Sequence, residues 1–196
     1  MGIDAKTLMQ LRNATGAGIS DCQTALEEAQ GDIDKAIEIL RKKGAVKAAK
    51  KIAERTATEG YIGNYIHSNG KIGVLVDLRC ETDFVARNPE FKALAQDIAM
   101  HVAAMNPSYL KPEEVPAQVL ETERGIYREQ LRNEGKPEQM WDQIIEGKLK
   151  KFYQENCLLQ QVYVKDESLT IDQLVNASIA KIGEKIEIAR FVRVQI

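Results

Sequence analysis

The fold is decided by Tyr61-Ile62-Gly63-Asn64-Tyr65-Ile66-His67-Ser68-Asn69-Gly70-Lys71-Ile72-Gly73-Val74-Leu75-Val76-Asp77-Leu78-Arg79-Cys80. Hydrophobic residues recur at every second position, which is typical of a strand with one buried face. Asn69-Gly70 separates two such runs and strongly favours a tight hairpin turn. We therefore expect strands at 61–67 and 72–80, with one face formed by Ile72, Val74, Val76, Leu78 and Cys80.

Helices follow this hairpin along the chain. Asn88-Pro89 is a typical helix start, and a helix up to Met105 is expected before Asn106-Pro107. Residues 113–156 predict an acidic helical hairpin that breaks near Glu134-Gly135-Lys136-Pro137. A last helix begins at Thr170, and residues 185–195 alternate as a final strand expected to pair with the hairpin. Strands, then helices, then a strand predict an α+β fold with a small antiparallel sheet packed by helices.

Three short helices are predicted before the hairpin, over residues 1–44. Asp4 is expected to cap the first, which ends at Thr15-Gly16-Ala17-Gly18. Ser20 and Gln23 have the spacing of a capping box for the second, which ends at Gly31. Asp32 caps the third, and Gly44 is expected to close it. Because such short helices are unstable alone, they must pack on one another as a small bundle.

A basic helical connector is predicted over residues 45–58, between this module and an α+β core domain at 59–196. Residues 41–55 include seven basic side chains and one acidic side chain, which gives a local charge of +6. A solvated basic face is favoured over a docking patch for an acidic partner. Nucleic-acid binding is the least favoured interpretation, because no aromatic residues are interleaved for base stacking.

Composition and the motifs that are absent from the sequence argue against an enzyme and against a membrane protein. The chain has 196 residues, of which 44% are hydrophobic and 29% charged, and its net charge is −2. No run is long enough to span a membrane, and the N-terminus lacks the pattern of a signal or transit peptide, so we expect a cytoplasmic protein. No nucleotide-binding glycine motif, metal-ligand spacing or nucleophile set is present, so no cofactor, metal or catalytic residue is predicted.

The cysteines and histidines support this interpretation. Cys22, Cys80 and Cys157 are far apart, which favours reduced, partly buried thiols over disulfides or a zinc site. His101 lies in a predicted helix among apolar residues and is expected to be a hydrogen-bonded core histidine. His67 at a strand end could donate to a neighbouring carbonyl.

The stretch from Glu81 to Asn88 carries the clearest functional signal. Phe84 lies between Asp83 and Val85 in a segment expected to be an exposed connection. Exposed aromatic side chains serve as anchors in protein interfaces. The alternative, that Phe84 packs in the core while Asp83 caps a helical turn, is equally compatible with the residues.

Several motifs, in sequence order, resemble the translation elongation factor Ts family across essentially the whole chain. The N-terminal motifs are Leu11-Arg12, Thr15-Gly16-Ala17-Gly18, Asp21-Cys22, Ala25-Leu26, Gly31-Asp32 and Lys35-Ala36. The core motifs are Tyr65-Ile66-His67, Gly73-Val74-Leu75-Val76, Cys80-Glu81-Thr82-Asp83-Phe84-Val85-Ala86-Arg87-Asn88, Gly147-Lys148-Leu149 and Ile182-Gly183-Glu184.

This resemblance implies a non-catalytic guanine-nucleotide exchange factor for elongation factor Tu. The first 44 residues would be a ubiquitin-associated-like module that docks on the GDP-bound partner. Thr82, Asp83, Phe84 and Val85 would be the segment that enters the partner near its magnesium ion, with Phe84 as the wedge. Losing the ion removes the main charge compensation of the bound diphosphate, so GDP leaves faster.

Departures from the family pattern concern both ends of the chain. Ile19-Ser20 stands where the family commonly has two methionines, so Arg12, Ile19 and Ser20 are the candidate contacts of the N-terminal module. The last strand, Ala189 to Val194, lacks the cysteine that some short members have, which excludes a covalent dimer through it. A non-covalent homodimer through the edge of that strand is a further expectation.

Two alternatives from other functional classes stay open at this point. The three-helix module could serve an adaptor that binds another protein, such as a ubiquitin-like one. Residues 41–55 could serve a ribosome-associated protein that binds RNA, although no direct nucleic-acid contact is expected. A hydrolase is the least favoured class, because no site for one is found.

Overall fold

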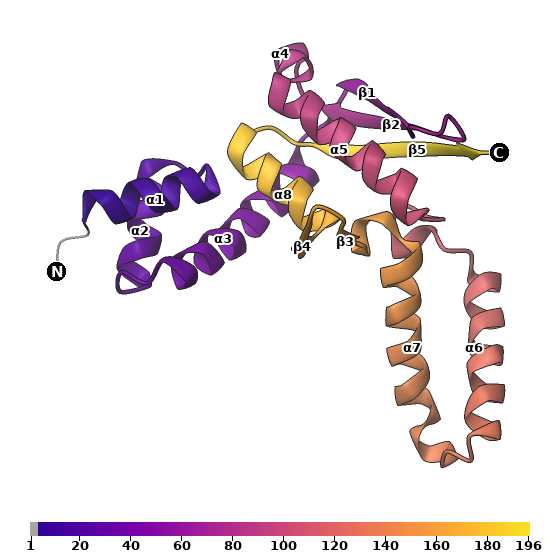
Figure 1. Ribbon diagram of the computed structural model, residues 1–196. Helices are drawn as coiled ribbons and strands as arrows, with labels where there is room; N and C mark the ends of the chain where they lie inside the picture. The colour runs from indigo at the N-terminus through magenta and orange to yellow at the C-terminus, as the bar shows by residue number, and fades with distance from the viewer. Residues whose placement is uncertain (1–3) are drawn as a thin grey trace. The chain divides into compact units, whose positions relative to one another are not determined.

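The computed structural model describes residues 4–196, without the side chains of residues 45 and 47–54. The chain divides into two compact units: one contains the described residues up to 63 together with 77–95 and 173–189, and the other contains 64–76, 96–172 and 190–196. Figure 1 labels the helices and strands of both. The helices are α1 (Ala5–Thr15), α2 (Ile19–Glu28), α3 (Ile33–Glu54), α4 (Asp83–Arg87), α5 (Pro89–Met105), α6 (Ala117–Asn133), α7 (Trp141–Asn156) and α8 (Ile171–Ile182). The strands are β1 (Glu59–Ile66), β2 (Ile72–Cys80), β3 (Val162–Tyr163), β4 (Asp166–Thr170) and β5 (Glu187–Gln195), and short 3-10 helices lie at Pro112–Glu114, Glu138–Met140 and Leu158–Gln160.

The first three helices pack around a small apolar core, as predicted. Its buried members are Leu11, Cys22, Ala25, Leu26, Ala29 and Ala36. Gly16 has a φ of 66° and ends α1, and the Asp32 carboxylate accepts a hydrogen bond of 3.1 Å from the Lys35 backbone N–H at the start of α3. The predicted capping box at Ser20 is wrong, because α2 already begins at Ile19 with Gly18 at the N-cap position.

Gly44 does not end the third helix. Helix α3 is continuous over 22 residues from Ile33 to Glu54, so the predicted third helix and the helical part of the predicted connector are one element. A glycine in a helix interior costs only about 1 kcal/mol, and the alanines and lysines after it favour helix propagation. The proposed boundaries at residues 44 and 58 remain a prediction.

The predicted hairpin supplies two strands of a three-stranded sheet with the order β1-β2-β5, in which β2 is the central strand. The Ile196 backbone N–H donates to the Lys71 carbonyl at 3.1 Å, so the end of β5 lies beside the start of β2 and the sheet is antiparallel. In β2, alternate residues Val74, Val76, Leu78 and Cys80 are buried, as their spacing predicted. The α+β class is therefore confirmed.

Helix α5 supplies the other large set of buried side chains. It begins at Pro89, and the Asn88 carboxamide oxygen accepts a hydrogen bond of 2.8 Å from the Glu90 backbone N–H. Its buried residues are Phe91, Leu94, Ala95, Ile98, Ala99, His101, Val102 and Ala103, whereas Met105 at its end is exposed. Gly63 of β1 approaches Ala95 so closely that a Cβ atom at position 63 would lie 2.6 Å from the Ala95 carbonyl oxygen.

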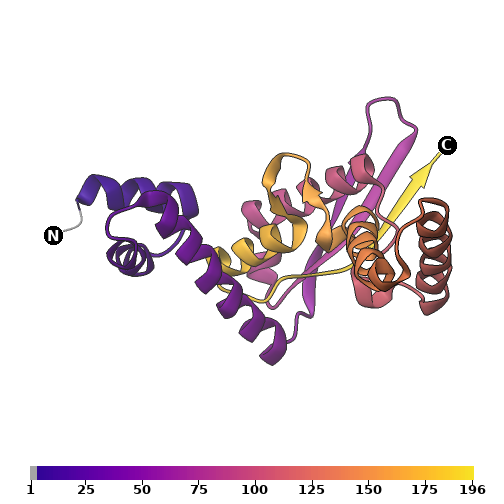
Figure 2. The ribbon, with the colours of Figure 1, turned by 90° about the horizontal axis from the view of Figure 1, so that it is seen from below.

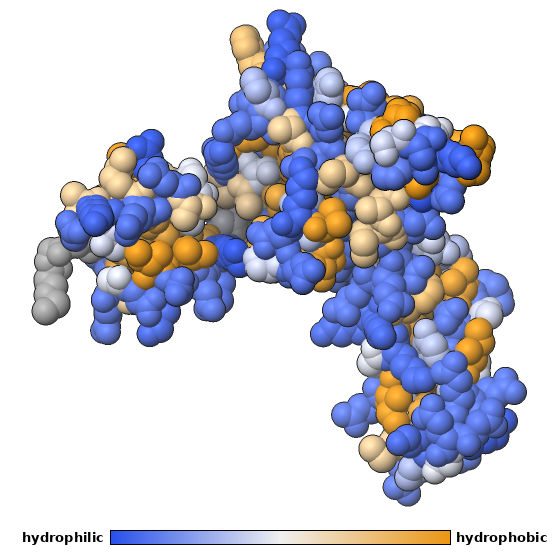
Figure 3. All heavy atoms as spheres, in the orientation of Figure 1, coloured by the Kyte–Doolittle hydropathy of each residue, from blue (hydrophilic) through white to orange (hydrophobic). Residues whose placement is uncertain are grey.

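The second helical stretch is an antiparallel hairpin of α6 and α7, which lie side by side in both ribbon views (Figures 1 and 2). Leu131, Ile145 and Leu149 form its buried core, and Leu120, Tyr127, Trp141, Ile144 and Tyr153 pack against them. Gly135 has a φ of 66° and makes the predicted break. Hydrophobic side chains come to the surface among hydrophilic ones along this hairpin (Figure 3).

A small sheet of β3 and β4 was not predicted. Its strands pair antiparallel, Val162 with Thr170 and Tyr163 with Asp166. His101 is fully buried beside it: Nε2 lies 3.0 Å from the Gln161 carboxamide oxygen, and Nδ1 accepts a hydrogen bond of 3.3 Å from the Val164 backbone N–H. This confirms the core histidine. His67 instead lies with its Nδ1 3.2 Å from the Tyr65 hydroxyl.

Two glycines in the hairpin helices give a stability prediction. Gly125 in α6 and Gly147 in α7 are exposed, and a Cβ atom at either would meet nothing within 4 Å. Gly125→Ala and Gly147→Ala should each raise the free energy of unfolding by about 0.5–1 kcal/mol, because alanine is the better helix former. Urea unfolding followed by circular dichroism measures this. Gly135→Ala is the matched control and should destabilise, since its positive φ strains alanine; a gain at Gly135 would contradict the argument.

The buried His101 predicts a pH dependence of stability. Burial lowers the pKa of His101 below its ordinary value of 6.5. Below pH 6.5 the unfolded chain binds a proton at this site that the folded chain does not, so stability is lost as the pH falls, with a slope approaching about 1.4 kcal/mol per pH unit. Urea unfolding at pH 7.5, 6.5 and 5.5 tests this, and His101→Gln should show a shallower slope. Equal slopes in the two proteins would be inconsistent with a neutral His101.

Candidate protein-binding site

The segment after β2 is a short helix rather than the exposed connection expected from the sequence. The chain leaves the sheet at Cys80, and α4 then covers Asp83–Arg87. Thr82 is the N-cap residue, and its hydroxyl oxygen accepts a hydrogen bond of 3.4 Å from the Val85 backbone N–H. Ala86 is buried and fixes the inner side of the helix. Thr82, not Asp83, thus caps this helical turn.

Phe84 lies on the outer side of α4, with 82% of its surface exposed. This exposure decides between the two interpretations of Phe84: the side chain is not part of the core. Asp83 forms an ion pair with Arg87, with 2.9 Å between the Asp83 carboxylate and the Arg87 guanidinium. The outer surface of α4 therefore presents a large aromatic ring next to a paired carboxylate, an arrangement suited to contact with another protein.

The base of α4 is fastened to the loop between α8 and β5. The Glu184 carboxylate accepts three hydrogen bonds: 3.2 Å from the Glu81 backbone N–H, 3.1 Å from the Thr82 backbone N–H and 2.7 Å from the Thr82 hydroxyl. In return, the Glu81 carboxylate accepts 2.6 Å from the Lys185 backbone N–H and 3.1 Å from the Arg55 guanidinium. Each of the two segments therefore uses a glutamate side chain to bind the backbone of the other.

Cys80 lies under this network. Its thiol is buried and donates to the Thr82 carbonyl oxygen at 3.2 Å. Burial, and secondarily the negative charge of Glu184, raises the pKa of Cys80 to about 11. The thiol is therefore protonated at neutral pH and acts as a hydrogen-bond donor. Cys22 and Cys157 are also free, and all three cysteines are fully buried rather than partly buried as expected.

The candidate contacts of the N-terminal module flank the turn between α1 and α2. Ile19 is the first residue of α2 and is 52% exposed. Arg12 in the last turn of α1 and Ser20 in the first turn of α2 are exposed as well. An apolar side chain with polar neighbours is thus available at this turn, on elements other than the one that carries Thr82–Val85.

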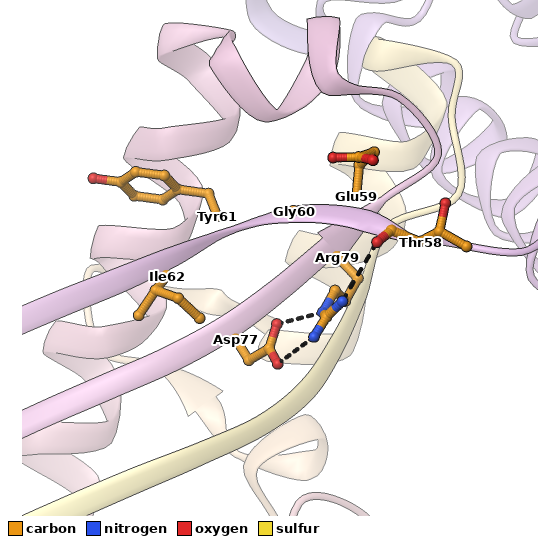
Figure 4. A pocket seen from close by; sticks show the side chains of 7 residues that line it. All are labelled: Thr58, Glu59, Gly60, Tyr61, Ile62, Asp77 and Arg79. Carbon is orange, nitrogen blue, oxygen red and sulfur yellow. Dashed lines mark hydrogen bonds and ion pairs between the residues drawn. The ribbon is translucent and has the colours of Figure 1, made fainter.

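An open hollow near the start of β1 has a different character (Figure 4). It is lined by Thr58, Glu59, Gly60, Tyr61, Ile62, Asp77 and Arg79. The Arg79 guanidinium donates to the Asp77 carboxylate at 2.9 Å and to the Thr58 carbonyl oxygen at 3.4 Å. Because the charges of Asp77 and Arg79 are paired with each other, this hollow does not assemble a nucleophile with a base or a set of metal ligands.

No metal centre is found among the residues that the structure describes: no three His, Cys, Asp or Glu side chains gather in a suitable way. Within the same part of the chain, no helix is both long and apolar enough to cross a membrane. The described residues do offer an exposed aromatic side chain on a short helix whose base is held by hydrogen bonds.

Sequence reasoning singled out Thr82–Val85 as a candidate site but did not identify the residues that hold this segment. Glu184 contacts Thr82 across 102 positions of sequence, and Glu81 contacts Lys185 across 104. The local signal was weak, since Glu184 simply follows the glycine that ends α8. Only the fold brings these residues together.

Known proteins provide an independent comparison. The family model described as elongation factor TS matches residues 5–196. An elongation factor Ts from Fervidobacterium nodosum is 58% identical over 196 residues, covering 100% of this chain and 99% of that protein. An elongation factor Ts from Thermosipho melanesiensis is 56% identical, with 97% of each chain covered. One from Geobacter metallireducens is 56% identical over 98% of this chain and 89% of its own. On this match along nearly its whole length, the chain belongs to the elongation factor Ts family of translation elongation factors.

Proposed function

We propose that this protein is a guanine-nucleotide exchange factor that binds elongation factor Tu in its GDP-bound form and promotes the release of GDP. The observation that carries the proposal is the 82% exposure of Phe84 on a helix whose base is tied down by hydrogen bonds. The side chain of an exposed phenylalanine stabilises a complex by hydrophobic burial only when a partner covers it. Family membership supports the choice of partner.

In this proposal Thr82, Asp83, Phe84 and Val85 act at the partner's magnesium site. Phe84 inserts as a wedge, and Asp83 helps to displace the groups that hold the ion. The loss of the cation leaves the diphosphate charge uncompensated, so GDP dissociates faster. No bond is made or broken, so the protein is not an enzyme. The effect is reciprocal: if the factor weakens the binding of GDP, then GDP weakens the binding of the factor by the same ratio.

Arg12, Ile19 and Ser20 supply a second contact, through which the N-terminal module docks on the partner. The exposed Ile19 gives this contact an apolar centre, and Arg12 and Ser20 supply polar groups around it. We place the protein in the cytoplasm, where translation elongation takes place, and propose no cofactor and no direct contact with nucleic acid.

A homodimer is a second assembly that one observation favours. β5 is an edge strand of its sheet, and Val192, Val194 and Ile196 are 52%, 61% and 87% exposed. An edge strand with alternating exposed apolar residues is a template for pairing with a second copy. The pairing is non-covalent, because residues 189–194 contain no cysteine. Sedimentation equilibrium tests it: a monomer mass at every concentration up to the highest studied would remove this proposal.

Phe84→Ala tests the wedge. The variant should remain folded, because the ring is exposed, and should lower the acceleration of GDP release by about 30-fold, since losing an interface aromatic typically costs about 2 kcal/mol or more. The measurement is the release rate of a fluorescent GDP analogue from elongation factor Tu in magnesium buffer, with and without the factor.

Ile126→Ala is the matched control, because it removes a 43%-exposed apolar side chain from α6. It should leave the release rate unchanged. A folded wild-type protein that does not accelerate release from a cognate partner would refute the exchange function and favour an adaptor. Acceleration that Phe84→Ala leaves intact would refute the wedge alone.

A further inference from the structure

We propose that Glu184 is a positioning residue for nucleotide exchange: it holds the segment Thr82–Val85 in the conformation that presents Phe84. This inference rests on the proposed exchange function and adds a residue that does not itself carry the wedge. Glu184 lies in the loop that joins α8 to β5, far from α4 in the sequence.

The first argument is the convergence of hydrogen bonds on one carboxylate. Glu184 Oε2 accepts from the backbone N–H groups of Glu81 and Thr82, at 3.2 and 3.1 Å, and Glu184 Oε1 accepts from the Thr82 hydroxyl at 2.7 Å. Both carboxylate oxygens are therefore occupied by the residues that immediately precede α4. Hydrogen bonds to an ionised acceptor are stronger than neutral ones, so this contact fixes the entry of the helix.

The second argument is the orientation of the Thr82 hydroxyl. A hydroxyl has one proton, and here it points to Glu184 Oε1. The oxygen lone pairs then remain available to accept from the Val85 backbone N–H, at 3.4 Å. Glu184 thus sets the direction of the hydroxyl that caps α4. Its influence reaches Val85, which it does not touch.

The third argument is that α4 has little else to hold it. It is five residues long, and helices this short are unstable by themselves. Phe84 is 82% exposed and contributes little packing, and Ala86 is the buried residue of the helix. The position of the ring therefore depends on the backbone at the base of α4, which is where Glu184 binds.

The residues on either side of Glu184 help to hold it in place. Gly183, with a φ of 91°, ends α8 and turns the chain toward the sheet. The Lys185 backbone N–H then donates 2.6 Å to the Glu81 carboxylate, and the Arg55 guanidinium donates to the same carboxylate at 3.1 Å. Since Glu184 lies directly beside Lys185, the reciprocal pair of contacts keeps its carboxylate next to Thr82.

This role has a kinetic signature. Without the Glu184 carboxylate, only a fraction of the free protein holds Phe84 in the conformation that binds the partner. The apparent affinity for the partner is reduced to that same fraction of its full value. Once the complex has formed, the partner itself holds the segment, and the maximal release rate is nearly kept. Loss of the wedge has the opposite signature, because Phe84→Ala lowers the maximal rate.

The experiment titrates each variant of the full chain against elongation factor Tu loaded with a fluorescent GDP analogue. Glu184→Ala should raise the factor concentration that gives half-maximal release by about tenfold and leave the maximal rate within about twofold. Glu184→Gln keeps one acceptor oxygen and should raise that concentration by about threefold. Amide hydrogen exchange at Thr82 and Val85 should accelerate in both variants.

Glu90→Ala is the matched control, because it also removes a glutamate carboxylate that binds a distant segment, here through an ion pair with Lys181 at 2.8 Å, but leaves the base of α4 intact. If Glu184→Ala unfolds, Glu184→Gln and Thr82→Val, which deletes the hydroxyl between Glu184 and Val85, carry the test. Glu184 variants indistinguishable from Glu90→Ala would overturn this inference while the exchange function stands. Wild-type protein without any acceleration would overturn both.

Discussion

The buried face of β2 is the constraint on which the rest of the structure depends. Val74, Val76, Leu78 and Cys80 alternate along the central strand of the sheet and are all buried. A shift of one residue would turn this set toward solvent, so the register of the strand is fixed. The point at which the chain leaves the sheet is fixed with it, and α4 starts three residues after that point. The sheet thereby decides where Phe84 lies.

Stability competes with the proposed function at α4. Burying a phenylalanine side chain is worth roughly 1.5–3 kcal/mol, and Phe84 forgoes most of that in the free protein. Hydrogen bonds replace apolar packing here: Glu184, Glu81 and Thr82 hold the base of the helix. The aromatic ring of Phe84 stays exposed and available to a partner. An exposed aromatic side chain on a fastened backbone loses little conformational freedom on binding, which favours affinity.

The sequence predicted those parts of the fold that depend on neighbours along the chain. Period-two alternation predicted the β1–β2 hairpin, and Asn88-Pro89 predicted the start of α5. The break at Glu134-Gly135-Lys136-Pro137 within an acidic helical stretch predicted the α6–α7 hairpin. Errors arose where two local signals competed. Gly44 is a helix breaker by type, yet its helix-forming neighbours carry α3 through it. The paired strands β3 and β4 were missed because Val162–Tyr163 is too short for a period to be recognised.

The exposed part of the candidate site could be singled out from the sequence, whereas the residues that support it could not. Phe84 stood out as an aromatic residue among charged neighbours, although burial and exposure were equally compatible with the residues. Its exposure depends on whether the core is already filled, and Ala86 occupies the inward position of α4. Glu184 could not be found from spacing, since its partners lie 102 and 103 positions away.

The thiol beneath the site has a chemical consequence for the working protein. With a pKa raised to about 11, Cys80 has about one thiolate in ten thousand at pH 7, and the thiolate is the form that oxidants and electrophiles attack. Its proton is also engaged with the Thr82 carbonyl oxygen. Oxidation to a sulfenic acid would place a larger, polar group under the cap of α4. The same burial that completes the apolar face of β2 therefore protects the helix against oxidative damage.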